Sequence, residues 1–185
     1  VQAIGKIATD DYLTDRVDFA TFSGHKFHSV RGVGFIYKKA GKKISPLLNG
    51  GGQEAGFRST TENVAGIAAM AKALRIVLDK AKIGQKQLLA MKRILFDSLS
   101  HYDDVILFSE MEYFAPNILT FGIKGVRGEV LVHAFEEHDI YISTTSACSS
   151  KAGKPAGTLI SMGISSKLAQ TAVRLSLDEN NDMSQ

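Results

Sequence analysis

The first candidate for chemistry is Lys26, which two histidines flank in the stretch "SGHKFH" at residues 23–28. This stretch follows the apolar run "VDFATF" and precedes the glycine-rich "RGVGFIY", so Lys26 is predicted to lie at a strand end. A free lysine amine is protonated at neutral pH, but burial or nearby cations can lower its pKa and make it nucleophilic. His25 and His28 are compatible with such a reactive amine. The alternative is a solvated surface lysine, which is where most lysines are found.

Cys148 is the one cysteine of the chain and lies in "TTSACSSKAG", among small residues rather than on an apolar stripe. Buried structural cysteines normally occupy a core face. A loop cysteine near Lys151 can be an accessible, partly ionised thiolate, and an inert thiol is the alternative. A single cysteine excludes an internal disulfide and a four-cysteine zinc site, and it fits a reducing, cytoplasmic setting.

Two further places could bind anions. The segment "NGGGQEAGFRSTTEN" at 49–63 has four glycines, the Arg58 guanidinium and several hydroxyls, including that of Thr61. These are phosphate-binding groups, although no Gly-Lys-Ser/Thr follows as in a Walker A loop, and glycine-rich loops are common. Arg174 interrupts the apolar "TAVRLSL" and is either an edge-strand arginine or a fixed fork for a carboxylate.

The apolar patterning predicts elements that would position these residues. Strands are expected over 17–23 and 33–39, and the aperiodic 49–63 is expected to be a long loop of the kind that is usually functional. Residue 63 begins a helical pattern that continues or restarts near residue 84. Further strands and helices are then expected at 104–109, 117–123, 127–139, 140–144, 158–164 and 167–177. Residues 1–62 are thus strand and loop material, and 63–185 form an α+β domain.

Composition bounds the function. The chain of 185 residues is 44% hydrophobic and 22% charged, as is usual for a globular protein, and its net charge of +3 is too small to argue nucleic-acid binding. No apolar run reaches the roughly 18 residues of a membrane span, and no signal peptide is recognisable. We therefore expect a cytoplasmic protein with no membrane or direct nucleic-acid partner. Because the chain begins without Met, in an apolar-looking segment, we expect a fragment.

Taken together, these motifs resemble one family. The stretches "DFATFSGHK", "RGVGFIY", "GGGQEAGFRSTTENVAGI", "APNIL", "STTSACSS" and "VRLSL" occur in the order seen in class V aminotransferases. The chain is most similar to the cysteine desulfurases of the NifS/IscS type, over essentially its whole length. The resemblance implies an α/β fold: residues 1–62 are the end of the large domain of a pyridoxal 5′-phosphate-dependent transferase, with a mixed sheet. Residues 63–185 are then a long linking helix and a small α+β domain carrying the cysteine loop.

The resemblance also implies a cofactor site. Lys26 is similar to the lysine that forms a Schiff base with pyridoxal 5′-phosphate, and Ser23 and His25 to the side chains that bind its phosphate. Gln2 matches the glutamine that contacts the phenolic oxygen of the cofactor. Thr61 resembles the threonine that reaches the phosphate of the partner subunit's cofactor in a homodimer. No metal is implied.

The implied reaction is the removal of sulfur from L-cysteine, which gives alanine and a persulfide on Cys148. Arg174 resembles the clamp on the substrate carboxylate. The sulfur would pass to an acceptor protein, either a scaffold for iron–sulfur clusters or a tRNA-thiolating sulfurtransferase. The alternatives are a selenocysteine lyase, another class V aminotransferase, or a non-enzymatic fragment used for dimerisation or acceptor docking.

Two departures from the family pattern qualify these expectations. Ser29-Val30-Arg31 replaces the usual Gly-Pro-Lys after the lysine, although no reacting group is lost. The family also has a long N-terminal portion, carrying a histidine that stacks on the cofactor ring and an aspartate that pairs with the ring nitrogen. The isolated 185-residue piece is therefore expected to bind the cofactor poorly and to be inactive.

Overall fold

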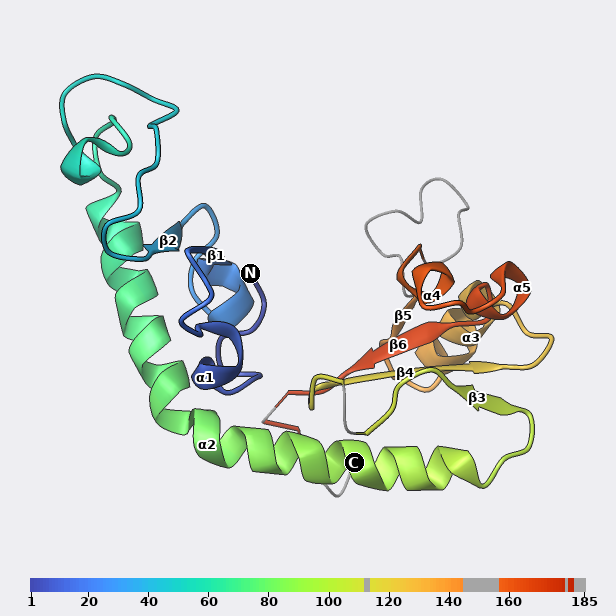
Figure 1. Cartoon of the computed structure of the whole chain (residues 1–185). Helices are drawn as coiled ribbons and strands as arrows, with labels where there is room; N and C mark the ends of the chain where they lie inside the picture. Colours follow the sequence, from blue (N-terminus) through green and yellow to red (C-terminus); the bar gives the residue numbers. More distant parts are fainter. Residues whose placement is uncertain (112–113, 145–156, 179, 182–185) are drawn as a thin grey trace. The chain divides into compact units, whose positions relative to one another are not determined.

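The computed structural model describes residues 1–111, 114–144, 157–178 and 180–181. It divides into two compact units, Val1–Gly84 and Gln85–Gln185. Figure 1 colours their elements by position along the sequence, from blue to red. Each unit is described by itself below. The division expected at 62/63 concerns the domains of an intact enzyme and stays a prediction.

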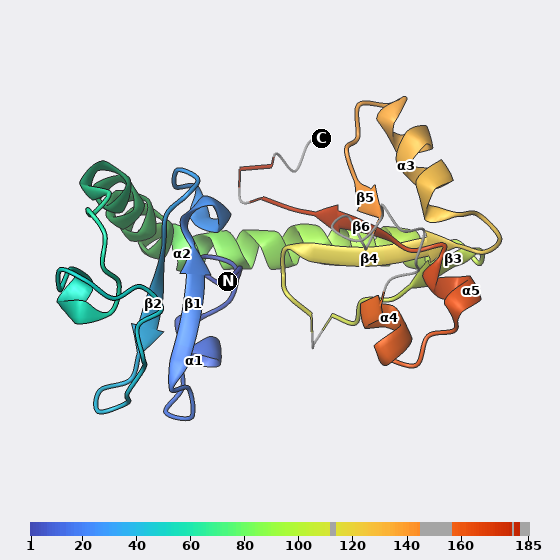
Figure 2. The same cartoon turned by 90° about the horizontal axis from the view of Figure 1, so that it is seen from above.

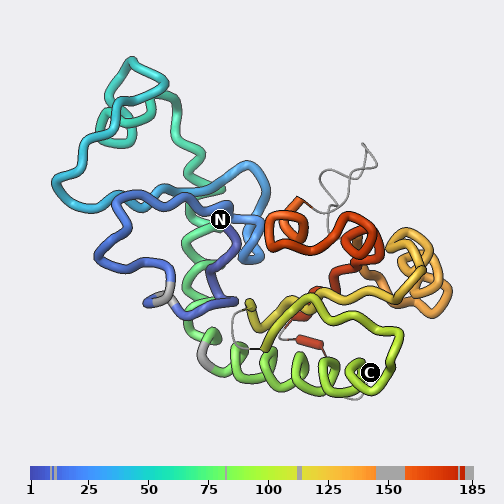
Figure 3. The backbone as a smooth tube through the Cα atoms, turned by 45° about the vertical axis from the view of Figure 1, so that its right-hand side comes forward, coloured from blue at the N-terminus to red at the C-terminus, as the bar shows by residue number. Residues whose placement is uncertain are grey.

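The first unit is built on an antiparallel hairpin. Strands β1 (Phe19–Ser23) and β2 (Gly34–Lys38) pair with Ser23 opposite Gly34 and Phe19 opposite Lys38, and they lie side by side in Figure 2. The remaining short elements are the helix α1 (Thr9–Tyr12) and the 3-10 helices η1 (Gly24–Phe27) and η2 (Glu54–Gly56). In Figure 3 the chain between β2 and α2 makes a long excursion, which agrees with the loop predicted over 49–63.

Aromatic rings hold the hairpin to its core. Phe22 and Phe27 are buried, and both contact Phe35, at centroid distances of 4.8 Å and 6.4 Å. Met70 and Val77 of helix α2 complete this cluster. They are seven residues apart, which is about two helical turns, so both lie on the same face of the helix.

Helix α2 (Val64–Ser100) is continuous, so the second helical pattern continues the first and does not restart it. Asn63 begins the helix, because its Oδ1 accepts a hydrogen bond of 3.0 Å from the Gly66 amide in the manner of an N-cap. A side chain at Gly66 would lie within 2.6 Å of the Val33 and Asn63 side chains. A larger residue at position 66 would therefore require the Val33 and Asn63 side chains to move.

The second unit is a four-stranded antiparallel sheet with helices on both faces. The sheet order is β3-β4-β6-β5, and Figure 2 shows α3 on one side of β4 and β6 and α4 and α5 on the other. The strands are β3 (Val105–Leu107), β4 (Ile118–Ile123), β5 (Ser143–Thr144) and β6 (Val173–Ser176). The helices are α3 (Gly128–Glu136), α4 (Gly157–Ser161) and α5 (Ser166–Ala169).

The two faces of this sheet carry different residues. Phe121 and Val173 are cross-strand partners and pack with Leu131 of α3 in one buried cluster. Since successive strand residues point to opposite faces, Thr120 and Arg174 lie on the other face. There a second cluster forms around Phe108, Leu159, Ala169 and Ala172.

The α/β class predicted from the sequence is confirmed. All strand pairs of the described residues are antiparallel. Among these residues, no helix has the length and apolar character needed to cross a bilayer.

Candidate active site

Lys26 lies where the sequence pattern predicted, directly after a strand. Strand β1 ends at Ser23 and η1 follows at once, so the chain reverses within a few residues. Phe22 and Phe27 are buried on either side, at 5% and 1% exposure, whereas Lys26 is exposed. A 3-10 helix has three residues per turn, so the burial of Phe27 turns its neighbour Lys26 outward. The amine is thus presented to solvent by a firmly anchored turn.

The turn after Lys26 is closed by backbone contacts. The Gly24 amide donates to the Val33 carbonyl at 2.9 Å, and the Ser29 amide donates to the Gly24 carbonyl at 3.1 Å. His28 has a φ of +66°, a left-handed conformation that is strained for a side chain larger than glycine. The turn is therefore well defined, although Ser29-Val30-Arg31 stands where the family usually has Gly-Pro-Lys. The Ser29 hydroxyl is buried and has no hydrogen-bond partner among the described residues.

The other cofactor-site candidates of this unit are available for a ligand. Ser23 occupies the N-cap position of η1, but its hydroxyl makes no capping hydrogen bond. His25, Gln2 and Thr61 are exposed. Ser23, His25 and Lys26 come together on one turn, while Gln2 lies near the chain start and Thr61 just ahead of α2. A hydroxyl that makes no capping hydrogen bond, an imidazole and an exposed amine at one strand end fit a phosphate-bearing aldehyde cofactor.

Arg174 belongs to the second unit, where it occupies an inner strand of the sheet. It pairs with Thr120 of β4 on one side and Ser143 of β5 on the other. Directly opposite residues point to the same face, so two hydroxyl side chains flank the arginine. The Arg174 Nε is buried and has no hydrogen-bond partner among the described residues. The edge-strand alternative for Arg174 is wrong, since β6 is paired on both sides.

Cys148 lies outside the described residues, as does its neighbour Lys151. The described part of the chain contains no cluster of three or more His, Cys, Asp or Glu residues that could hold a metal ion.

Lys92 is a feature that sequence reasoning missed. Its side chain is fully buried on α2, and its Nζ donates to the Ala115 carbonyl at 3.2 Å and lies 5.7 Å from the Phe114 ring centroid. Burial lowers the pKa of the Lys92 amine, because the charged form loses its hydration. A usable signal was its position four residues after Leu88 and three before Leu95, on the apolar stripe.

The fold is that of a known class of protein. The family model described as aminotransferase class-V matches residues 1–185, and the chain belongs to this family. Among curated proteins, a NifS/IcsS protein homolog of Lactobacillus delbrueckii subsp. bulgaricus is 50% identical over 184 residues, which cover 99% of this chain and 48% of the relative. A cysteine desulfurase IscS of Clostridium botulinum is 35% identical over 98% of this chain and 46% of its own length.

Solved structures agree with this placement. A NifS-like protein matches with a TM-score of 0.84 at 34% identity, over 100% of this chain and 47% of its own. A NifS-like protein from Rickettsia africae matches with a TM-score of 0.81 at 28% identity, over 100% and 48%. The family resemblance predicted from the motifs is therefore confirmed. The chain spans about half the length of the relatives it matches.

Proposed function

We propose that the protein to which this chain belongs is a pyridoxal 5′-phosphate-dependent cysteine desulfurase. The observation that carries the proposal is the exposed Lys26 amine, presented at a strand end between two buried phenylalanines. The proposal is further supported by the printed names of the two curated relatives. Bound pyridoxal phosphate supplies an electron sink for chemistry at the α-carbon of an amino acid.

Each residue of the candidate cofactor site then has a proposed task. Lys26 Nζ would hold the aldehyde of the cofactor and would move protons at the substrate α-carbon as a general base and acid. Ser23 and His25 would hold the cofactor phosphate, and Gln2 would hold its phenolic oxygen. The anchoring of the turn by Phe22 and Phe27 favours this chemistry, because a small misplacement of a reacting group is costly in rate.

Arg174 binds the carboxylate of L-cysteine. A guanidinium whose buried Nε has no hydrogen-bond partner within the described part of the chain is suited to this, because a carboxylate can accept two parallel N–H bonds from it. Its place on an inner strand between Thr120 and Ser143 fixes the stem of the side chain.

Cys148 is the proposed sulfur acceptor. Its thiolate attacks the substrate sulfur, a new S–S bond forms as the substrate C–S bond breaks, and alanine leaves after protonation of its carbon. The persulfide then passes to an acceptor protein, which is a scaffold for iron–sulfur clusters or a tRNA-thiolating sulfurtransferase. The enzyme would act as a cytoplasmic homodimer in which Thr61 would help to hold the phosphate of the partner subunit's cofactor.

Borohydride reduction tests the lysine assignment. The full-length protein is loaded with pyridoxal phosphate, reduced, digested and mapped by mass spectrometry. The expected result is a pyridoxyl group on Lys26. Labelling of another lysine, with Lys26 unmodified, would refute the proposal.

A comparison of substrates tests the reaction. Alanine release is measured with L-cysteine and with L-selenocysteine, for the native protein and for Cys148→Ala. A desulfurase loses alanine release from cysteine in the variant, whereas a selenocysteine lyase keeps its selenocysteine activity and works poorly on cysteine. Full cysteine activity in Cys148→Ala would rule out a persulfide on that residue.

A further inference from the structure

Three segments of the first unit meet at one ammonium group, that of Lys38. Lys38 is the last residue of β2, and its Nζ lies 5.6 Å from the ring centroid of Phe57, within the range of a cation–π contact. The same Nζ donates a hydrogen bond of 2.9 Å to the Lys42 carbonyl. The ammonium therefore joins the end of β2, the lysine-rich turn at residues 39–43 and the glycine-rich loop at residues 49–63.

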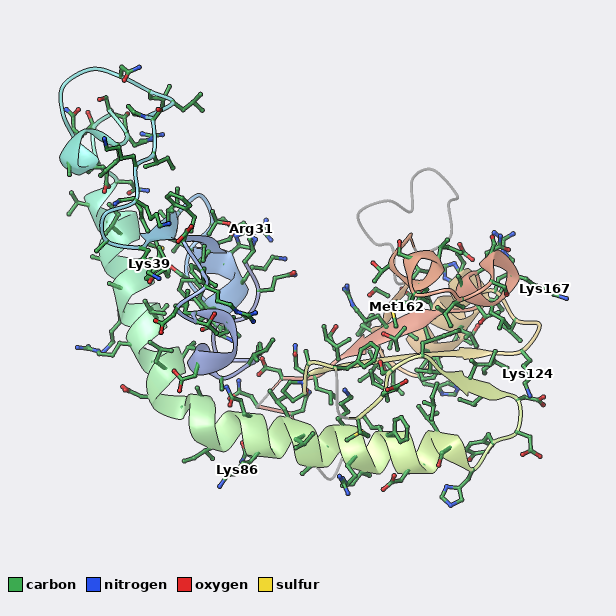
Figure 4. The ribbon with its side chains drawn as sticks, in the orientation of Figure 1. Arg31, Lys39, Lys86, Lys124, Met162 and Lys167 are labelled. Carbon is green, nitrogen blue, oxygen red and sulfur yellow. The ribbon has the colours of Figure 1, made fainter. Side chains whose placement is uncertain are left out.

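The lysine-rich turn is itself fixed to the hairpin, so it makes a firm base for this contact. The Lys39 amide donates to the Asp18 carbonyl at 2.9 Å, and Lys42 pairs with the Asp18 carboxylate at 3.0 Å. The Lys39 amine also donates to the Asp15 carbonyl, and Figure 4 labels Lys39 in this unit. Lys38 thus contacts the ring from an anchored position.

The glycine-rich loop has a specific conformation that needs such support. Glu54 and Ala55 have φ values of +51° and +55°, which are unfavourable for residues with a Cβ. A side chain at Gly51 would lie 2.9 Å from the Gln53 amide, so the loop is closely packed there. The Ser59 amide donates to the Leu48 carbonyl at 3.0 Å and closes the loop. Strained backbone persists only where surrounding contacts hold it in place.

We propose that Lys38 is a positioning residue that holds the glycine-rich loop in its strained conformation through the ring of Phe57. The inference rests on the proposed function, in which Thr61, four residues after Phe57, reaches the partner subunit's cofactor. Lys38 acts on that contact only through the loop and touches no reacting group. An aromatic ring at residue 57 and a cation at residue 38 form one unit, so loss of either has the same effect as loss of both.

Limited proteolysis tests the contact without reference to activity. Trypsin cleaves after Arg58, which directly follows Phe57, and the fragment that begins at Ser59 is quantified by mass spectrometry. In the full-length protein, Lys38→Met and Phe57→Leu are each expected to raise the initial rate about two- to fivefold, the range of an exposed cation–π contact. The double variant is expected to be no faster than either single one. Lys38→Arg keeps a cation over the ring and is expected to restore the native rate.

The matched control is Lys43→Met, which removes an exposed lysine of the same turn and is expected to leave the rate unchanged. Equal rates for Lys38→Met and Lys43→Met, or additive effects in the double variant, would overturn the proposal.

Cofactor affinity separates this inference from the proposed function. The dissociation constant for pyridoxal phosphate is measured by absorbance for Thr61→Ala and Lys38→Met. If Thr61→Ala weakens binding, Lys38→Met is expected to weaken it about two- to fivefold as well. Weakening by Thr61→Ala alone overturns the positioning role and leaves the proposed function intact. If Thr61→Ala does not weaken binding, Thr61 does not contact the cofactor and Lys38 cannot position that contact. This outcome overturns the positioning role even where proteolysis confirms the contact between Lys38 and Phe57.

Discussion

At the scale of single residues, solvent exposure distinguishes two lysines, Lys26 and Lys92. Lys26 is exposed next to a buried phenylalanine, whereas Lys92 is fully buried on a helix. The Lys26 amine is accessible to a ligand. The Lys92 ammonium has lost its hydration and contacts only one carbonyl and one aromatic ring among the described residues. The fold itself lowers the pKa of Lys92 through burial, whereas the proposed role of Lys26 depends on the exposure of its amine.

Replacing Lys26 tests its catalytic role. Lys26→Ala is expected to lower alanine release by the full-length enzyme by about 10³-fold, within the usual range for a general acid–base group. Because the side chain is exposed, the free energy of unfolding should change by less than about 0.5 kcal/mol. Arg31→Ala, a cation of the following turn that Figure 4 labels, should keep the activity. Similar activity in both variants would contradict the role.

The buried Lys92 is expected to make the free energy of unfolding depend on pH. Its folded-state pKa is lowered by burial, so between that pKa and about 10.4 the unfolded chain binds more protons than the folded one. The free energy of unfolding should therefore rise with pH across this window, because the penalty for the buried charge disappears as the amine loses its proton. At pH values below the folded pKa the full penalty remains.

The variant Lys92→Met should be more stable than the native chain by about 1 kcal/mol at pH 7, since removal of a buried charge is often stabilising. The Ala115 carbonyl keeps its hydrogen bond of 3.2 Å from the Ile118 amide, so no acceptor is left unpaired. Urea denaturation at pH 7 and pH 10 measures both effects. Lys86→Met, at an exposed position of the same helix labelled in Figure 4, should change neither. A native-like pH slope in Lys92→Met would count against this account.

At the scale of elements, the β1–β2 hairpin positions the lysine turn through one close backbone approach. A Cβ on Gly34 would lie 2.4 Å from the Phe22 carbonyl oxygen, which is backbone and cannot swing aside. Gly34 pairs with Ser23, the residue that begins the turn. The register that places Ser23, His25 and Lys26 therefore depends on a glycine in the facing strand.

Gly34→Ala should destabilise the protein by about 1–3 kcal/mol, the usual cost of overpacking, and should lower activity with it. Gly157→Ala is the control, because a Cβ there meets no atom of the described residues within 4 Å. Chemical denaturation of both variants gives the comparison. Equal stabilities would show that the hairpin relaxes around the added methyl group.

At the scale of the whole molecule, exposed apolar side chains gather between β2 and the start of α2. Leu47 is 93% exposed and Leu48, Phe57 and Val64 are also exposed in this segment. Exposed apolar side chains can mark an interaction surface, and the proposed homodimer offers a partner for this segment. The glycine-rich loop that carries Thr61 belongs to the same segment.

Leu47→Glu should therefore weaken self-association of the full-length protein by at least about tenfold, the equivalent of 1.4 kcal/mol. Sedimentation velocity across a range of concentrations measures the change. Leu89→Glu changes an exposed leucine that lies on α2, outside this segment, and should leave the oligomeric state unaltered. If Leu47→Glu dimerises as strongly as the native protein, this segment is not the interface.

The sequence by itself determined the family, the α/β class and the order of the main elements. Short motifs such as "SGHK" and the period of the apolar residues depend only on neighbours along the chain, and local conformation follows from them. The helical pattern of α2 and the two strands on either side of Lys26 were predictable for this reason. Their pairing as a hairpin was not, because the lysine-rich stretch after β2 suggested a return strand at 44–48, where the structure has none. The short helix α1 was not, because four residues leave too little periodicity.

Only the tertiary structure decided which residues meet across long stretches of chain. The burial of Lys92, the contact of Lys38 with Phe57 and the flanking of Arg174 by Thr120 and Ser143 each join residues distant in sequence. Such pairings depend on strand register and on the packing of helices against sheets, which local patterns do not specify. A lysine's sequence neighbours could not tell a reactive surface amine from a buried one, because burial is set by the surroundings of the fold.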